Sequence, residues 1–149
     1  MADVRFYHLQ RSSIEGALLM LLEKSLEAGK RAVVRFASDE EMSAMDAALW
    51  TVKPDSFLPH GTTASKKADD QPVLLTAGHD NPNKAEFAFV LPGATGDALD
   101  YYERVFFVFY GNSESQVKEA RGRWKDLTGE GLTPEYWTQD DAGGWTKKQ

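Results

Sequence analysis

The chain has 149 residues, of which 42% are hydrophobic and 27% charged, so its length and composition predict one globular domain over residues 1–149. It contains no cysteine, which excludes disulfides, thiol nucleophiles and cysteine-based metal sites, and which is compatible with the reducing cytoplasm where we expect the protein. Its formal net charge of −6 argues against general binding to the DNA phosphate backbone, no apolar run approaches the ~20 residues of a membrane helix, and the first residues lack the pattern of a signal peptide.

The first third of the chain alternates predicted strands with predicted helices. Val4–Leu9 and Arg31–Ala37 have the alternating or continuously apolar patterns of strands. Ile14–Ala28 carries five leucines behind a pair of serines that can cap a helix. A capping box beginning at Ser38 opens a second helix, Met42–Trp50. This order of strand, helix, strand and helix is typical of a parallel α/β sheet.

The middle of the chain adds short apolar strands separated by turns. Residues 49–61 contain two prolines and are too apolar for an ordinary solvated loop, whereas residues 62–71 are polar. Strands are predicted at residues 72–76, 85–91 and 102–110, and the last holds the most apolar run and is expected at the centre of the sheet. We predict a single α/β domain with a mostly parallel sheet flanked by helices, and a basic tail that frays after about residue 145.

A final predicted helix, beginning at Ser113, combines an apolar stripe with a basic one. At about 100° per residue, its apolar face takes Val117, Ala120, Trp124 and Leu127, and the flank beside it takes Lys118, Arg121 and Lys125. Residues 118–125 hold four cations and one glutamate, a local charge of +3 in an acidic chain. The stripe is either a solvated face beside a core tryptophan or a site for an acidic partner; from the residues alone, the first interpretation is favoured.

Catalytic and cofactor motifs are weak in this sequence. The first strand-to-helix turn, Gln10–Ser13, has neither glycine nor lysine. The glycines elsewhere in the sequence do not form a phosphate-binding fingerprint. His8, His60 and His79 lack metal-ligand spacing, and no serine stands in a nucleophile elbow. We therefore expect a Rossmann-like fold without a nucleotide-binding fingerprint, with no catalytic residue, metal or cofactor. A small α/β nucleotide-binding enzyme and direct binding of single-stranded DNA by the basic helix are the alternatives.

Three stretches together resemble the chi subunit family of bacterial DNA polymerase III. The first is Val4–Leu9, and the second is Asp46–Trp50 followed by Ser56–His60. The third is a series of short segments in family order, namely Pro72–Thr76, Asn81–Asn83, Glu103–Val105, Ala120–Lys125 and Tyr136–Trp137. The similarity runs from about Val4 to Trp145, nearly the whole chain.

This resemblance implies an accessory, adaptor subunit of the clamp-loader assembly with no catalytic activity of its own. Members of the family bind the acidic, Phe-terminated tail of single-stranded DNA-binding protein (SSB), through which they reach DNA. They also bind the psi subunit, which links chi to the clamp loader, and in some bacteria a repair helicase competes for the same surface.

Site residues carry over from the family position by position. The resemblance assigns the SSB tail to Arg121, Trp124 and Lys125, where the well-known member has Tyr at the position of Trp124. Lys118 adds charge one turn earlier, and Trp137 is expected to wall the pocket. With the family in view, the basic flank is interpreted as a binding site, and Trp50 and Phe57 as the surface for psi, another clamp-loader component or the helicase.

Overall fold

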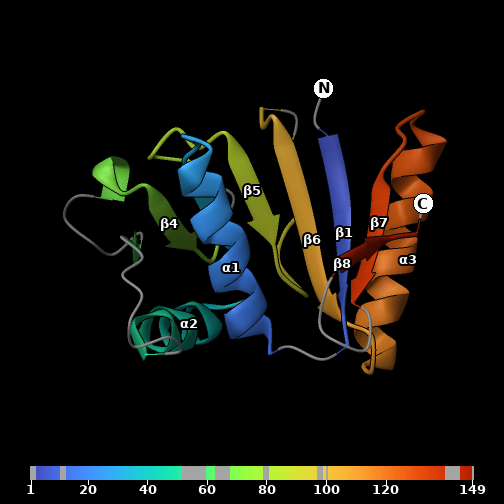
Figure 1. Ribbon diagram of the computed structural model, residues 1–149, viewed down its shortest axis with the longest axis horizontal. Coiled ribbons are helices and arrows are strands. Elements are labelled where there is room, and N and C mark those ends of the chain that lie inside the picture. Colours follow the sequence, from blue (N-terminus) through green and yellow to red (C-terminus); the bar gives the residue numbers. More distant parts are fainter. Residues whose placement is uncertain are drawn as a thin grey trace.

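The computed structural model describes residues 3–10, 13–51, 60–62, 68–78, 81–96, 99, 101–139 and 145–148, without the side chains of residues 50 and 51. These residues form one α/β domain built on an eight-stranded sheet (Figure 1). The strands are β1 (Asp3–Leu9), β2 (Ala32–Arg35), β3 (Gly61–Thr62), β4 (Val73–Thr76), β5 (Phe87–Val90), β6 (Arg104–Tyr110), β7 (Glu135–Gln139) and β8 (Trp145–Lys147). The helices are α1 (Ile14–Glu27), α2 (Asp39–Thr51) and α3 (Glu114–Gly129), with a short 3-10 helix, η1 (Ala68–Asp70).

The sheet is parallel except at one edge. Its strand order is β3-β4-β2-β5-β6-β1-β7-β8, and only β7 and β8, among the pairs described, run antiparallel. Strand β6 lies between β5 and β1 and buries five consecutive residues, 105–109. The predicted α/β class, the mostly parallel sheet and the central place of residues 102–110 are therefore confirmed.

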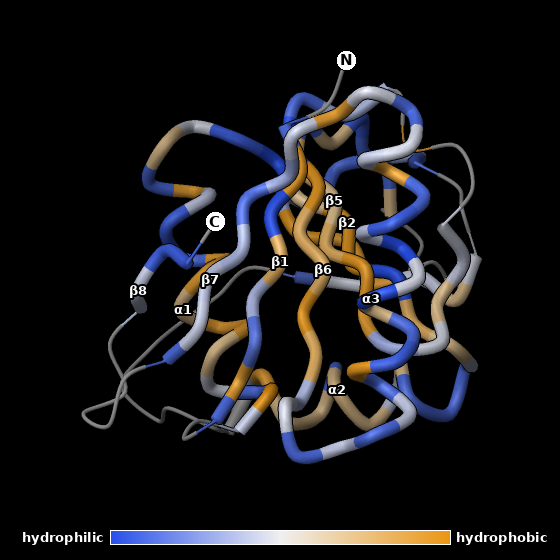
Figure 2. The backbone as a smooth tube through the Cα atoms, turned by 90° about the vertical axis from the view of Figure 1, so that its right-hand side faces the viewer, coloured by the Kyte–Doolittle hydropathy of each residue, from blue (hydrophilic) through white to orange (hydrophobic). Residues whose placement is uncertain are grey.

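The helices cover the two faces of the sheet separately. One core cluster joins α1 and α2 to residues such as Tyr7 and Leu9 of β1, and the other joins α3 to Val4 and Phe6 of the same strand. Successive side chains of a strand point to opposite faces, so β1 contributes to both cores. Figure 2 shows the hydrophobic strands between α1 on one side and α3 on the other.

A serine side chain caps the N-terminus of each of the three α-helices, as the sequence predicts. The Gly16 amide donates to Oγ of Ser13 at 3.2 Å, so Ser13 caps α1. Ser38 accepts from the Glu41 amide at 3.2 Å at the start of α2, and Ser113 caps α3. These contacts satisfy amides that the first turn of a helix leaves without a backbone partner.

The predicted fraying of the C-terminal tail is not what the structure shows. Residues 145–147 form β8, which pairs with β7. Trp145 packs edge-on against Tyr7, with ring centroids 4.9 Å apart, and the Lys148 amide donates to the Tyr136 carbonyl at 2.7 Å. The basic composition of the tail suggested a solvated segment, but the packing of Trp145 and the pairing with β7 place it in the sheet.

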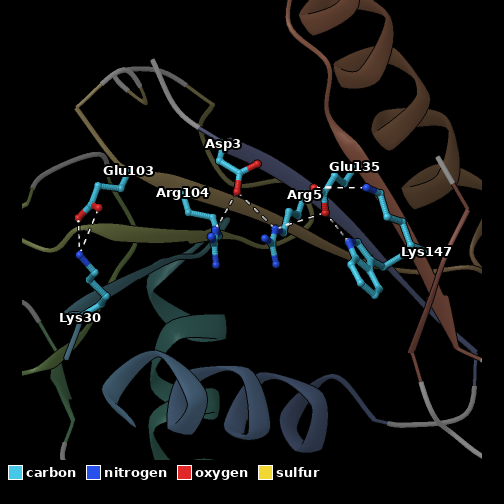
Figure 3. Close-up of polar contacts among 8 residues, drawn as sticks. Asp3, Arg5, Lys30, Glu103, Arg104, Glu135 and Lys147 are labelled. Atoms are coloured by element: carbon cyan, nitrogen blue, oxygen red, sulfur yellow. Dashed lines mark hydrogen bonds and ion pairs between the residues drawn. The ribbon is translucent and has the colours of Figure 1, made fainter. Parts of the chain in front are cut away.

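A row of alternating charges crosses four strands on the α1 side of the sheet (Figure 3). Nε of Arg104 lies 2.9 Å from Oδ2 of Asp3, and Nε of Arg5 lies 3.5 Å from the same oxygen and 3.5 Å from Glu135. Nζ of Lys147 lies 3.6 Å from the other oxygen of Glu135. The row thus connects β6, β1, β7 and β8 in order.

Glu135 is the acceptor on which the β7 end of this row depends. Burial acts to raise the pKa of this carboxyl, but the Trp137 indole, which donates to it at 3.0 Å, and the charges of Arg5 and Lys147 outweigh burial. The pKa of Glu135 therefore lies below its ordinary value. The carboxylate form is the one that the folded protein stabilises.

Replacing Glu135 with glutamine is expected to lower the free energy of unfolding at pH 7 by about 1 kcal/mol, because it weakens ion pairs that are each worth up to about 1 kcal/mol. Since the pKa of Glu135 is lower in the folded protein, this stabilisation is present above the ordinary carboxyl pKa of about 4.3 and is lost as the pH falls below it. Urea unfolding of both proteins at pH 7 and at about pH 3 measures the difference.

Glu103→Gln is the matched control, because the exposed Glu103 carboxylate pairs with Lys30 outside the row. We expect this substitution to cost less than Glu135→Gln at pH 7. A penalty for Glu135→Gln that is the same at both pH values would contradict the role given to its carboxylate.

Candidate functional site

A cavity of about 350 Å³ lies between α3 and the sheet, and we call it the α3 cavity. Its volume falls within the range of about 300–1,000 Å³ that is usual for ligand pockets. Four strand residues and four helix residues line it: Phe6, His8, Phe109 and Tyr136 from the sheet, and Val117, Ala120, Arg121 and Trp124 from α3.

The floor of the cavity follows from the register of three neighbouring strands. Phe6 of β1 pairs with Tyr136 of β7, and His8 of β1 pairs with Phe109 of β6. Because side chains alternate along a strand, residues 6 and 8 share the face that α3 covers. Parallel pairing in register therefore gathers four aromatic or imidazole rings under one helix.

Trp124 closes the cavity from above and also packs against the core. Its indole meets the Phe6 ring edge-on at 5.4 Å and the Tyr136 ring at 6.0 Å, and it is half-buried. Such edge-to-face pairs contribute about 0.5–1.5 kcal/mol beyond the area they bury. The other members of the predicted apolar stripe also pack on this core, so the predicted orientation of α3 is confirmed.

Three cations lie on the outer side of α3, and one of them reaches the cavity. Arg121 is exposed and lines it, whereas Lys118 and Lys125 are exposed on the same helix without lining it. Within the part of the chain that the structure describes, no carboxylate forms an ion pair with Arg121. Burial raises the pKa of the Tyr136 hydroxyl, and the positive charge of Arg121 offsets part of that effect.

The fourth cation of the basic segment, Arg123, faces the core instead. Its Nη2 donates to the Ala94 carbonyl at 2.7 Å, and its guanidinium lies over the Phe107 ring at 4.9 Å from the centroid. Burial lowers the pKa of this guanidinium. Arg123 therefore anchors the loop after β5 and does not contribute to the cavity.

Trp137, which the sequence places at the wall of this pocket, lies on the opposite face of the sheet. Its ring stacks on Tyr7 with centroids 6.2 Å apart, in the core cluster that contains α1. Its neighbour Tyr136 lines the α3 cavity instead. A shift of one residue along a strand exchanges the two faces, which is why adjacent aromatics are easily confused in sequence.

The sequence-based interpretation missed the four lining residues of the sheet, Phe6, His8, Phe109 and Tyr136. The sequence predicts that His8 lies in a strand. Whether its side chain points toward α3 depends on which face of the sheet that helix covers. Once α3 is placed on the side of Phe6, alternation assigns His8 to the same cavity.

The second predicted surface is only partly within the described residues. Trp50 lies in the last turn of α2, but its side chain is not described, and Phe57 lies outside the described residues. The nearest described side chain after that segment is His60, which is buried with Nε2 3.1 Å from Oδ1 of Asp46 on α2. The role of Trp50 and Phe57 stays a prediction.

A second cavity, of about 270 Å³, lies where α/β folds commonly bind nucleotides, at the carboxyl ends of β2 and β5. Its apolar lining includes Phe36, Met45 and Leu91. The charged members of this lining, among the described residues, are the carboxylates of Glu15 and Glu41, and no lysine or arginine joins them. Two carboxylates oppose a phosphate group, so this cavity does not favour the nucleotide-binding alternative.

The described residues offer neither a metal-binding cluster nor a membrane-spanning helix. They contain no cluster of three or more His, Cys, Asp or Glu side chains arranged to hold a metal ion. None of the described helices is long and apolar enough to cross a membrane.

Comparison with known proteins gives the family of the chain. The family described as DNA polymerase III chi subunit, HolC, matches residues 1–135, which include β1, β6 and all of α3. A relative from Rickettsia prowazekii (strain Madrid E), described as "Probable DNA polymerase III subunit chi", is 24% identical over 152 residues, covering 99% of this chain and 92% of the relative. The chain therefore belongs to the DNA polymerase III chi subunit family.

Proposed function

We propose that this chi-family subunit is a non-catalytic adaptor with two binding surfaces. The α3 cavity binds the acidic C-terminal tail of SSB. The surface around Trp50 and Phe57 binds the psi subunit, another clamp-loader component or a repair helicase. Through these two contacts, SSB-coated DNA is coupled to the replication machinery, and the subunit reaches DNA only through SSB.

The observation that carries the first part is an aromatic cavity with an arginine in its wall. A peptide that ends in an apolar residue needs a pocket for that side chain, a cation for its terminal carboxylate and further positive charge for acidic residues upstream. Phe6, Phe109 and Trp124 supply the pocket, and Arg121 supplies a planar guanidinium that can bind a carboxylate through two hydrogen bonds. Exposed lysines on the same helix supply the remaining charge.

The two alternatives find less support in the geometry. A nucleotide-binding enzyme would need a cation or free amides at the carboxyl edge of the sheet, where Glu15 and Glu41 line the cavity. Direct stacking of single-stranded DNA needs an open aromatic face, whereas the Trp124 ring packs against Phe6 and Tyr136. The net charge of −6 also opposes direct binding.

We expect an SSB tail peptide to bind with micromolar affinity, about −8 kcal/mol, and Arg121→Ala to weaken binding at least roughly tenfold. Hydrogen bonds to charged groups contribute about 1.5–3 kcal/mol, which accounts for a loss of this size. Added salt should weaken the wild-type complex as well, because exposed charges are screened. Isothermal titration calorimetry measures all three effects.

Lys24→Ala is the control for this substitution, because it removes one exposed positive charge from α1 on the other face of the sheet. It should leave the affinity nearly unchanged. Equal affinities for wild type and Arg121→Ala would overturn the assignment of the tail to the α3 cavity.

Trp50→Ala and Phe57→Ala are expected to abolish capture of the second partner while leaving the tail affinity intact, because residues 50 and 57 are far from α3 in the sequence and are proposed to serve a separate partner. Arg121→Ala should have the opposite pattern. Pull-downs with purified psi subunit or helicase, alongside peptide calorimetry, test this separation. Loss of tail binding in Phe57→Ala, with an unchanged melting temperature, would argue against two independent surfaces.

A further inference from the structure

The α3 cavity contains a polar pair, His8 and Tyr136, that the proposed function has not yet used. Nδ1 of His8 lies 2.5 Å from the hydroxyl oxygen of Tyr136, and both residues line the cavity together with Arg121. Both groups are half-buried, and a cavity that served only to hold an apolar side chain would gain little from a hydroxyl and an imidazole in its lining. The pair therefore points to a polar group of the ligand.

The imidazole of His8 is held in one orientation. Its ring packs against Phe109 at 5.2 Å and Tyr136 at 5.9 Å between centroids. A Cβ at position 111 would lie only 1.6 Å from its Nε2, so the ring occupies space that only glycine at that position leaves open. Nδ1 is thus directed at the Tyr136 hydroxyl by packing on three sides.

The proton arrangement of this pair determines what it can offer. If Nδ1 carries the proton, it donates to the Tyr136 oxygen, and the phenolic hydrogen is free to donate to a ligand. If Nδ1 is bare, the phenolic hydrogen is used up by His8, and the pair presents only an acceptor. A carboxylate in the cavity favours the arrangement in which Nδ1 carries the proton and the phenolic hydrogen points to the ligand. A doubly protonated imidazole has a proton on Nδ1 and therefore gives the same arrangement.

We infer that Tyr136 donates a second hydrogen bond, beside Arg121, to the terminal carboxylate of the bound peptide, and that His8 is the positioning residue that makes this possible by donating to Tyr136. The inference rests on the proposed function, since it concerns the same cavity and ligand. It adds a proton linkage: a carboxylate bound through Tyr136 favours the protonated form of His8, so binding takes up protons.

The surroundings of His8 fit this linkage. Burial lowers the pKa of His8 in the free protein, so the imidazole is neutral at physiological pH before the ligand arrives. Among the described residues, the titratable or charged groups that share the cavity with it are Tyr136 on β7 and Arg121 on α3, and β6 contributes the uncharged Phe109. Lys118 and Lys125 of α3 are exposed outside the lining. A ligand carboxylate brings the negative charge that this lining lacks.

Tyr136→Phe tests the direct contact, because it removes the hydroxyl and keeps the ring. Its affinity should be measured, beside wild type, for two peptides of one acidic, Phe-terminated sequence, one with a free C-terminal carboxylate and one with a C-terminal amide. We expect Tyr136→Phe to bind the free-acid peptide roughly tenfold more weakly and the amide about as wild type does. Competition against a labelled free-acid peptide brings the weak complexes into range.

The pH profile tests the role of His8. Wild-type affinity for the free-acid peptide should rise by at least about threefold from pH 8 to pH 6, since protonation of His8 favours the complex. His8→Gln keeps a donor for Tyr136 but does not titrate, so it should retain most of the affinity at pH 8 and lose the pH dependence. His8→Leu removes the donor and should behave as Tyr136→Phe does, with thermal melts of all variants as the folding control.

The outcomes separate this inference from the proposed function. Wild type that fails to bind the free-acid peptide overturns both. Wild type that binds through Arg121, while Tyr136→Phe binds both peptides as wild type does, overturns the inference alone. A pH dependence in His8→Gln equal to that of wild type removes His8 from the mechanism.

Discussion

The alternation of side chains along β1 is the constraint on which the rest of the structure depends. β1 lies between β6 and β7 in parallel register, and its residues 5–8 have partners on both sides. Phe6 and His8 form part of the floor of the α3 cavity. On the other face, Asp3 and Arg5 belong to the ion-pair row and Tyr7 to the opposite core. β1 thus contributes both to the floor of the α3 cavity and to the ion pairs that connect β6, β7 and β8. A substitution in β1 has to be considered on both faces.

The arginines of α3 lie in different surroundings and therefore have different roles. Arg121 and Arg123 are two positions apart, and side chains at that spacing do not lie on one side of a helix. Arg123 is committed to the Ala94 carbonyl and the Phe107 ring, while Arg121 stays at the wall of the cavity. The basic segment of the sequence is therefore divided: Arg123 anchors a loop, and Arg121 lines the α3 cavity.

The elements of this fold were largely predictable from the sequence, because their signals are local. Serine caps, the leucine-rich α1 and the apolar run in β6 lead directly to the observed elements, and the helical periodicity of α3 places Trp124 and Arg121 correctly relative to each other. The strand order was not predictable in this way: β5 and β6 lie between β2 and β1, and this adjacency depends on packing between distant segments. Trp137 was misplaced because its role was carried over from the family without a predicted strand at residues 135–139, so nothing indicated which of the adjacent aromatics faces α3. His8 was missed because a strand residue can be assigned to a cavity only once the helix that covers its face of the sheet is known.

The two ends of the sheet share one further property. β3 contributes two residues at one edge and β8 contributes three at the other, so each described edge strand presents few amide and carbonyl groups for another strand to pair with. At the β8 edge these groups are accompanied by the exposed side chains of Lys147 and Lys148. Short, lysine-bearing edge strands are a common means by which sheet proteins resist unwanted strand addition. The exposed lysines of the tail therefore disfavour self-association through this edge of the sheet.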